Sequence, residues 1–374
     1  MLQTIEQAMM DVFDHLHEHP ELSLEEYETT RYLAEKLKKH DISVTTFEDM
    51  PGLVAEIGSG KPVIAVRADM DALLQEVNGE IKANHSCGHD AHMTIVVGLL
   101  LLLKERQKEW RGTLRCIFQP AEEKGNGSLK MVEKGAVDDA VYLFGVHLRP
   151  KEEVKFGFAA PSLQHGAAAS MEGMILGEDS HGARPHLGVN AIEVGYSLQQ
   201  FLRSVHMPPN IPSSIKMTSF HAGTSSYNII PGKATFSLDL RAQTNQVLAD
   251  MRQKVEDALK AVSKFHGVDI SGNWLDYTPA AEVSSEAETI MKESIISILG
   301  EEHCMNPVVT SGSDDFHFYT IERPHLKACM LALGADLTPG LHHPHMTFNK
   351  SCLMAGTLIL KEAVLRAFSA ANKK

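Results

Sequence analysis

The sequence predicts an α/β protein in which a mixed, largely parallel sheet has helices on both faces and is interrupted by a smaller α+β domain. One observation is the length, since 374 residues exceed what a single hydrophobic core usually organises. Another is the repeated alternation of short apolar runs with segments of helical periodicity in the N-terminal part. The third is a change to a β-α-β-β-α-β order that begins near Ala168.

The N-terminal part alternates between helices and strands. Helical periodicity predicts helices over Thr4–His17, Leu24–Lys39, Ala91–Glu105 and Ser128–Glu133. Apolar runs predict strands over Ser43–Phe47, Leu53–Ile57, Val63–Ala68, Thr113–Phe118 and Val141–Val146. Pro20 ends the first helix, and Ser23, with Glu26 three residues later, is the predicted N-cap of the second. This order indicates a largely parallel sheet.

The middle of the chain has the pattern of a separate, ferredoxin-like unit. Strands are predicted over Ser170–Leu176, Ser214–Phe220, Ala234–Leu240 and Val268–Trp274, and helices over Val189–Val205 and Gln246–Phe265. After it the α/β pattern returns, with predicted elements at Ser285–Leu299, Ala328–Leu333 and Asn349–Ser369. We therefore expect residues 168–276 to form a domain inserted into a discontinuous domain of residues 1–167 and 277–374.

Composition excludes several classes of protein. The net charge of −13 argues against a nucleic-acid or anionic-membrane surface. No apolar run reaches the ~20 residues that a bilayer-spanning helix needs, and Met1–Asp14 lacks the apolar core of a signal peptide. The five cysteines are scattered and odd in number, which is typical of a reducing compartment. A cytoplasmic location is expected.

Histidine is the informative residue type. The chain has 20 histidines, and many of them cluster. A single surface histidine means little, but clusters close to cysteine and glutamate favour a metal site. The clusters are His15, His17 and His19; His85, His89 and His92; His181 and His186; and His342, His343 and His345.

Four polar segments either follow predicted strands or open the predicted buried helix. In chain order they contain Asp69 with Asp71, Cys87 with His89, Glu122 with Glu123, and His147. Ligands of open α/β sheets bind beyond the carboxyl ends of the strands, so we expect these segments to meet. Each has an ordinary alternative: an acidic turn, a helix start that happens to contain Cys and His, or a histidine satisfied in the core.

The residue types suit a metal-dependent hydrolase. Cys87 and His89 offer sulfur and nitrogen to one ion across a glycine, although a cysteine nucleophile with a histidine base is an open alternative. Of two adjacent glutamates, Glu122 and Glu123, one can bind metal while the other faces a reacting water. With a histidine from the segment 340–345, the set provides S, N and O ligands, and a dinuclear metal site is the most economical interpretation.

The chain resembles the aminoacylase/carboxypeptidase family of metallopeptidases. Within this family it is similar to the branch of N-acyl-amino-acid amidohydrolases, hippurate hydrolases and auxin-conjugate hydrolases. The resemblance runs nearly end to end. It is carried by the following motifs in family order: Leu16–Ser23, Arg67–Leu73, Cys87–His92, Phe118–Glu123, Gly145–His147, Ser180–His186, Asn228–Gly232, Ser313–Phe316 and Leu341–Pro344.

The resemblance implies roles for single residues. Glu122 matches the general base that deprotonates a water bridging two divalent ions (Mn, Zn, Co or Ni) and protonates the leaving nitrogen. Asp71 is placed with it in the catalytic set, and Asp90 matches an acidic position beside the site. The residues that match the family's metal ligands are Cys87, His89, Glu123, His147 and His342.

The resemblance also implies that the inserted domain is a lid that mediates dimerisation. His181, Asn228 and Arg241 are the candidate substrate-binding residues, the last because a guanidinium pairs bidentately with a carboxylate. The implied reaction hydrolyses the amide bond of an N-acyl-L-amino acid to a carboxylic acid and a free amino acid. A dipeptidase or carboxypeptidase with the same machinery, and a non-catalytic binding protein on the same fold, are the alternatives.

Three positions depart from the family pattern. Leu74 stands where proline is usual, Asp314 where glutamate is usual, and His343 where a small residue is usual. None of them removes a candidate ligand, so a hydrolase is still expected. The acyl group and the amino acid do not follow from the resemblance.

Overall fold

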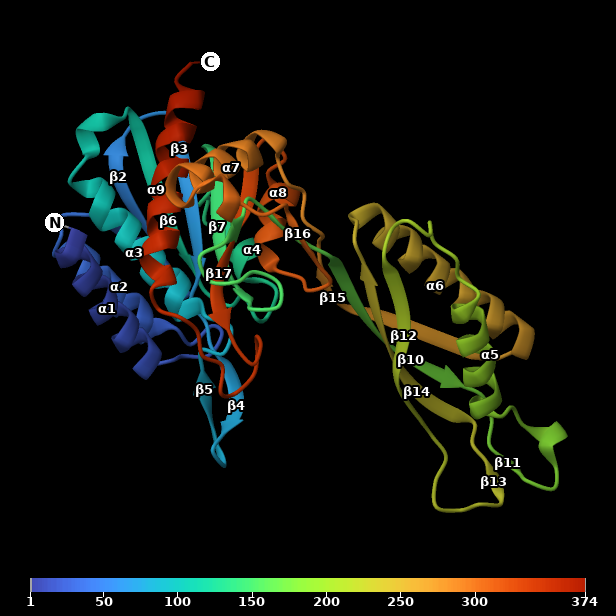
Figure 1. Cartoon of the computed structure of the whole chain (residues 1–374). Helices are drawn as coiled ribbons and strands as arrows, with labels where there is room; N and C mark the ends of the chain where they lie inside the picture. Colours follow the sequence, from blue (N-terminus) through green and yellow to red (C-terminus); the bar gives the residue numbers. More distant parts are fainter. Residues whose placement is uncertain (1, 374) are drawn as a thin grey trace. The chain divides into compact units, whose positions relative to one another are not determined.

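The computed structural model describes residues 2–373 as two compact units (Figure 1). The second unit comprises His165–Ala281 together with Thr310–Asp314, and the first comprises the rest of the described chain. The short segment 310–314 thus lies with the second unit, outside the range that the sequence order assigns to the inserted domain. The functional side chains considered below lie mainly in the first unit.

A seven-stranded mixed sheet organises the first unit. Its order is β1 (Ser43–Thr46), β2 (Leu53–Ser59), β6 (Gly112–Gln119), β3 (Val63–Asp69), β7 (Ala140–Pro150), β17 (Lys327–Leu337) and β8 (Ala159–Ala160). The four central strands β6, β3, β7 and β17 run parallel, and the outer strands pair antiparallel. The predicted mixed, largely parallel sheet is confirmed.

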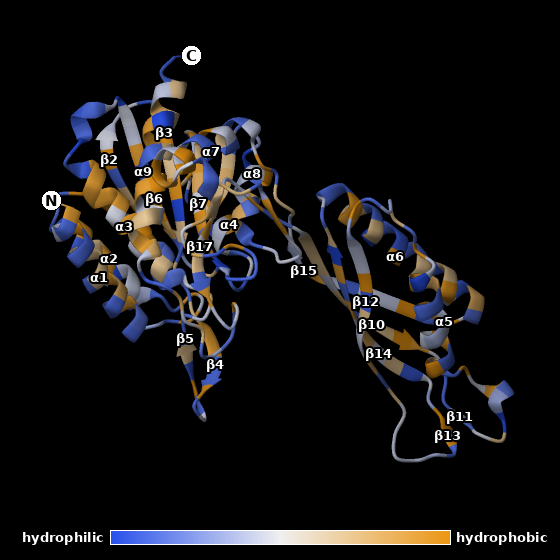
Figure 2. Cartoon of the chain, viewed as in Figure 1, coloured by the Kyte–Doolittle hydropathy of each residue, from blue (hydrophilic) through white to orange (hydrophobic). Residues whose placement is uncertain are grey.

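Both faces of this sheet are buried under helices, as expected. Along β3, Ile64, Val66 and Ala68 enter one apolar core, and the alternating Val63 and Ala65 enter a second. The larger core receives α1 (Leu2–Glu18), α2 (Tyr27–Lys38), α3 (His89–Lys104), α7 (Ser285–Leu299) and α9 (Cys352–Ala371). The smaller receives α4 (Gly127–Glu133) and α8 (Phe318–Glu322). Figure 2 shows these strands and inner helix faces as predominantly apolar.

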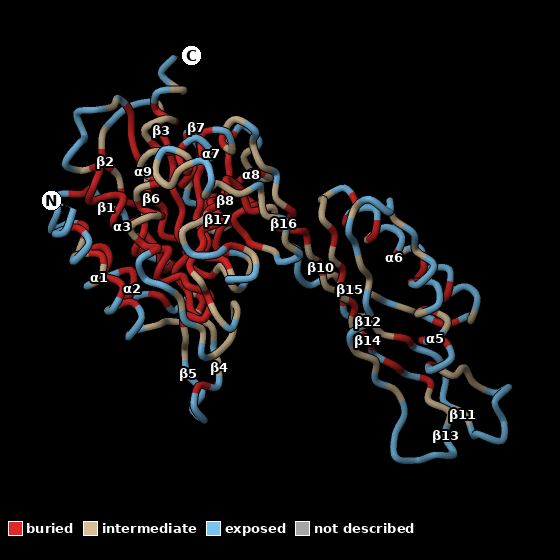
Figure 3. Tube along the Cα trace, viewed as in Figure 1, coloured by how far each residue is buried: buried red, intermediate tan, exposed pale blue. Residues whose placement is uncertain are grey.

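Helix α3 is the central helix of the first unit. Every residue from His89 to Leu103 is buried, which explains its nearly continuous apolar sequence (Figure 3). Gly98 allows close packing, because a Cβ there would lie 2.5 Å from Met9 Sδ and 3.0 Å from Thr357 Oγ1. The burial of α3 fixes its N-terminus, from which the candidate ligands project. None of the helices within residues 2–373 is long and apolar enough to cross a membrane.

The second unit has its own sheet and core. Its antiparallel sheet has the order β12 (Ser213–Ala222), β14 (Lys233–Ala242), β10 (Ala167–Leu176) and β15 (Asp269–Thr278). Helices α5 (Ala191–Arg203) and α6 (Asn245–His266) contribute apolar side chains to the core that this sheet forms. The connections give the predicted β-α-β-β-α-β plait. A small pair, β11 (Ser180–His181) with β13 (Ile229–Ile230), joins two of its loops.

Three features differ from the sequence prediction. Helix α2 begins at Tyr27 instead of Leu24, and the predicted N-cap was wrong: the Ser23 hydroxyl donates to Asp71, 2.6 Å away. The hairpin β4 (Leu73–Val77) with β5 (Glu80–Asn84) was not predicted, because its mostly exposed residues lack an apolar pattern. The short pair β9 (Leu163–His165) with β16 (Val308–Thr310) was likewise unforeseen.

Truncation inside α3 tests the importance of this core. Leu99 is fully buried, so Leu99→Ala is expected to lower the free energy of unfolding by about 2–5 kcal/mol. Leu74 is 61% exposed, so Leu74→Ala is the matched control, with an expected change within about 0.5 kcal/mol. Urea unfolding of both variants measures the difference, and equal losses would contradict the assignment of α3 as the central core helix.

Candidate metal centre

The candidate residues of the first unit gather at the end of the sheet where the parallel strands β3 and β6 finish. Asp69 ends β3, and the segment 120–123 follows β6. Cys87 lies just before α3, and His89 is its first residue. His147 lies within β7, which continues to Pro150 and is longer than predicted. His342 comes from the loop that follows β17.

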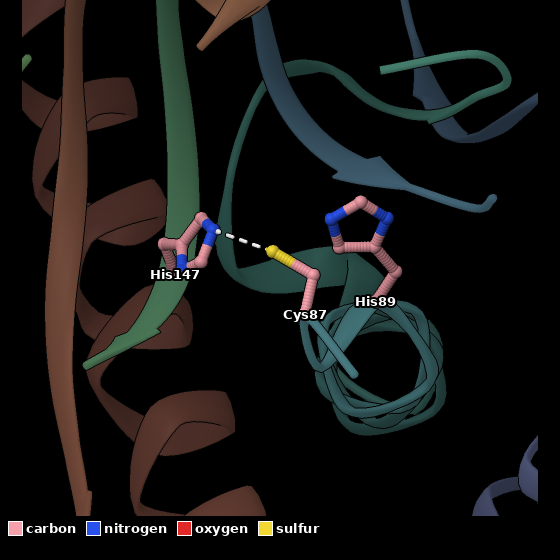
Figure 4. Close-up of side chains that lie close together, drawn as sticks. All are labelled: Cys87, His89 and His147. Carbon is pink, nitrogen blue, oxygen red and sulfur yellow. Dashed lines mark hydrogen bonds between the residues drawn. The ribbon is translucent and has the colours of Figure 1, made fainter. Parts of the chain in front are cut away.

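The five predicted ligands form two overlapping groups. The donor atoms of Cys87, His89 and His147 all lie within 4.8 Å of one another, as do those of Cys87, Glu123 and His342. The two groups share the Cys87 thiol, whose Sγ lies 3.7 Å from His147 Nε2 (Figure 4). His342 Nε2 lies 3.3 Å from Glu123 Oε1. The sequence prediction thus selected residues that the fold brings together.

Glu122 lies next to both groups. Its carboxylate belongs to a further set with His89 and Glu123 whose donor atoms are all within 4.8 Å, and its Oε2 lies 3.9 Å from His89 Nε2. Glu122 and Glu123 therefore have different surroundings although they are adjacent in the sequence. This arrangement is suited to one ligand and one base.

The buried carboxylate of Asp71 orients both glutamates. Its Oδ1 accepts the Glu122 amide and its Oδ2 accepts the Glu123 amide, each at 3.0 Å, and Ser23 donates to Oδ2. The Asp71 carbonyl accepts from His89 Nδ1 at 2.8 Å. Burial alone would raise the pKa of Asp71, but the interactions with His89 and Ser23 outweigh it and hold the pKa below its usual value.

A second buried carboxyl group supports the same loop. Glu26 Oε1 accepts the amide of Ala121 at 2.8 Å, and Ala121 has an unusual φ of 54°. Three consecutive amides, 121–123, are thereby held by two carboxyl groups. Burial and the charge of Asp71 raise the pKa of Glu26 to about 8. This role carries no signal in the sequence, where Glu26 fits the pattern of a helix start.

His92 is buried beside the centre, but both of its ring nitrogens are engaged. Nδ1 lies 2.7 Å from Asp69 Oδ1, and Nε2 accepts the amide of Leu148 at 3.0 Å. An acceptor Nε2 requires the proton on Nδ1, so His92 donates to Asp69. This assigns His92 to the support of the centre, although its donor atoms lie within 4.8 Å of those of Asp69 and His89.

A buried ion-pair network lies behind Asp69. The Arg67 guanidinium contacts Asp69 at 2.5 Å and Asp315 at 2.8 Å, and its Nε donates to Gln119. Asp315 also accepts from the amide of Ser128. Asp315 is thus connected to the centre through Arg67. Asp90, predicted to lie beside the site, is held by His17, whose Nδ1 lies 2.7 Å from its Oδ2.

The donor set fits divalent cations. His89 Nε2 and Glu123 Oε1 are buried polar atoms without a hydrogen-bond partner, which is costly unless something else binds them. Burial raises the pKa of the Cys87 thiol, and a nearby cation would favour the thiolate instead. Sulfur, imidazole and carboxylate ligands together suit Zn²⁺ and related ions.

The three candidate substrate-binding residues lie in the second unit. His181 and Asn228 are neighbours, because β11 pairs with β13 and the Gly182 amide donates to the Asn228 carbonyl at 2.8 Å. The exposed His181 ring accepts the Ala183 amide. Arg241 lies on β14, where it contacts Asp239 at 3.0 Å. The assignment of all three to substrate binding stays a prediction.

Curated relatives cover nearly the whole chain. The N-acetyl-L-cysteine deacetylase of Bacillus subtilis is 28% identical over 378 aligned positions, covering 98% of this chain and 89% of the relative. The IAA-amino acid hydrolase ILR1-like 6 of Arabidopsis thaliana is 32% identical, covering 92% of this chain and 76% of the relative.

A solved structure shows the same fold. The Bacillus subtilis YXEP protein, described as a dinuclear metal-binding peptidase of the M20 family, superposes with a TM-score of 0.84 and 25% identity. The match covers 98% of this chain and 99% of that protein. A family model matches residues 65–366, a range that includes every candidate ligand of the metal centre. The chain therefore belongs to peptidase family M20/M25/M40, whose members hydrolyse amide bonds.

Proposed function

We propose that this protein is a two-metal amidohydrolase that releases a free amino acid from an N-acyl-L-amino acid or a related conjugate. The observation that carries the proposal is the position of Glu122, whose carboxylate lies against the two ligand groups while Asp71 holds its backbone amide. A binding protein would need the ligands but not a base beside them. The overlap of the two ligand groups at Cys87 supports two ions and not one.

The five candidate ligands would hold two divalent ions, with Cys87, His89 and His147 in one group and Cys87, Glu123 and His342 in the other. When bound, such ions polarise a carbonyl oxygen and lower the pKa of a water towards about 7. His89 is prepared as an Nε2 ligand, because its Nδ1 donates to the Asp71 carbonyl. His147 is oriented in the same way by the Leu148 carbonyl, 2.7 Å from its Nδ1.

Glu122 would move the protons of the reaction. Its carboxylate takes a proton from the attacking water as the oxygen adds to the amide carbon, and it returns that proton to the nitrogen when the C–N bond breaks. The products are a carboxylic acid and a free amine. Asp71 acts as a positioning residue in this scheme, since both of its oxygens are occupied by Ser23 and the amides of Glu122 and Glu123.

Similarity supports the substrate class. Two relatives are named as a deacetylase of N-acetyl-L-cysteine and a hydrolase of IAA–amino acids, and both names specify a substituted amino acid. For the present chain we propose the same general class, a substrate with an acylated amino group. His181, Asn228 and Arg241 are proposed contacts of such a substrate, and a homodimer is proposed from the family resemblance.

A cysteine hydrolase that uses Cys87 with His89 fits the site less well. A nucleophilic cysteine needs a lowered pKa, whereas burial raises the pKa of this thiol. The sulfur lies 3.7 Å from His147 Nε2, and its donor atom forms one group with those of His89 and His147, all within 4.8 Å of one another. These contacts favour a thiol that serves as a ligand.

Replacing the base tests the mechanism. Glu122→Gln removes the proton acceptor with little change in shape, so turnover should fall by about 10²–10⁴-fold, while metal content stays at the wild-type level. Glu133→Gln, at an exposed position at the end of α4, is the matched control and should retain full activity. Amino-acid release and metal analysis check both variants. Near-normal turnover in Glu122→Gln would refute the assigned base.

Metal removal tests the cofactor. Activity should vanish on treatment with a chelator and return when Mn²⁺, Zn²⁺, Co²⁺ or Ni²⁺ is supplied separately, because the proposed reaction needs the bound ions. Thiol alkylation of the metal-loaded protein should change the activity little, because Cys87 would be buried and bound to metal. Full activity after complete chelation, combined with inactivation by alkylation, would instead favour the cysteine mechanism.

A substrate panel separates the two activities that fit this site. N-acetyl and N-benzoyl amino acids are expected to be hydrolysed with higher kcat/KM than dipeptides, as measured by release of the free amino acid. Faster hydrolysis of dipeptides would identify a dipeptidase or carboxypeptidase with the same machinery. Conversion of the substrate carboxylate to an amide should lower kcat/KM if that group is recognised.

A further inference from the structure

The β4–β5 hairpin presents two different faces. Its register pairs Leu73 with Asn84, Leu74 with Ala83, and Gln75 with Lys82. Since side chains alternate between faces, Gln75 and Asn84 share one face and Leu74 lies on the other. The first face contacts the loop that contains His342, which makes the hairpin a neighbour of the metal centre.

Two side-chain amides connect the hairpin to this loop. Gln75 Nε2 donates to the His342 carbonyl at 2.7 Å, and Gln75 Oε1 accepts from Asn84 Nδ2 at 3.1 Å. Asn84 Nδ2 also donates to the Pro344 carbonyl at 3.1 Å. The chain of donors and acceptors fixes the orientation of the Gln75 amide, because a flipped amide would place oxygen against oxygen.

His342 needs such support more than the other candidate ligands do. Its φ of 63° lies in the left-handed region, which is unfavourable for a residue with a Cβ. Its side chain is 53% exposed, whereas His89 is fully buried. Two hydrogen bonds hold its backbone: the amide donates to the Ser86 carbonyl at 2.8 Å, and the carbonyl accepts from Gln75.

Only the second of these bonds, to the His342 carbonyl, depends on the identity of a side chain. The bond to Ser86 uses backbone atoms only and tolerates any side chain, whereas the bond to the carbonyl depends on an N–H donor at position 75. Rotation of the peptide after His342 would loosen the backbone that holds the imidazole Nε2 3.3 Å from Glu123 Oε1. The Gln75 amide opposes that rotation.

We propose that Gln75 is a positioning residue that fixes His342 for metal binding, and that Asn84 orients the Gln75 amide. The inference rests on the proposed function, because it takes His342 as a ligand. We expect the effect to be confined to the ligand group that contains His342, because Gln75 and Asn84 hold the loop that carries this residue. Gln75 thereby links an exposed hairpin to one ion of the pair.

Metal titration of the full chain tests this proposal. Metal-stripped wild type and variants are titrated with Co²⁺ by calorimetry and followed by the visible absorption of the bound ion. Gln75→Glu keeps the shape but has no N–H donor, and Gln75→Ala removes the donor without adding charge. His342→Ala marks the ion that depends on His342, and Glu76→Gln, an exposed position on the other face of the hairpin, is the control.

Both Gln75 variants should lower the affinity for one of the two Co²⁺ ions by about 10–100-fold. This is the effect typical of losing a partner that orients a ligand. The affected ion should be the one lost in His342→Ala, and the other ion, the thermal stability of the metal-free protein and the Glu76→Gln titration should be unchanged. The same selective loss of affinity in Asn84→Ala would support the proposed role of Asn84 in orienting the Gln75 amide.

The outcomes separate the inference from the function on which it rests. Unchanged Co²⁺ binding in both Gln75 variants, with one ion weakened in His342→Ala, would overturn the positioning role and leave the proposed ligand set standing. Unchanged binding in His342→Ala would overturn the ligand assignment itself, and the inference with it. Equal weakening of both ions in the Gln75 variants would show a general structural effect and would also overturn the proposal.

Discussion

The arrangement of the centre depends on one buried carboxylate, that of Asp71. It accepts two consecutive backbone amides, those of Glu122 and Glu123, and the hydroxyl of Ser23, while its carbonyl orients His89. These bonds join the end of β3, the loop after β6, the start of α3 and the segment before α2. A residue with three such contacts at its carboxylate and a fourth at its carbonyl fixes the relative positions of a base and two ligands, which side chains on separate loops would not achieve alone.

The fold was largely predictable because its elements bury periodic apolar faces. The alternating residues of β3 and the continuous apolar sequence of α3 indicate a sheet covered on both sides. Prediction failed where tertiary contacts decided the local structure. Ser23 is a residue type that often caps the start of a helix, but its hydroxyl donates to Asp71 instead. The β4–β5 hairpin has exposed polar strands, so periodicity did not reveal it.

The candidate ligands could be predicted from the sequence, but the residues that hold them in place could not. Cys87, His89 and Glu123 are metal-binding residue types in short motifs, so the sequence alone indicates them as candidates. Their partners carry no such pattern: Glu26 holds the Ala121 amide from 95 residues away, and Gln75 holds His342 from 267 residues away. Contacts of this length depend on the complete fold, and residue types such as Glu and Gln are too common to indicate them.

The charge balance of this region gives a physical reason for its composition. Asp69, Asp71 and Asp315 are buried carboxylates, and Glu122 and Glu123 are mostly buried beside them. Arg67 offsets part of this charge through its ion pairs with Asp69 and Asp315. An excess of buried acidic groups is unfavourable unless positive charge compensates it. Two divalent cations would supply that charge where His89 Nε2 and Glu123 Oε1 lack hydrogen bonds, so the same groups that destabilise the metal-free region would bind the ions.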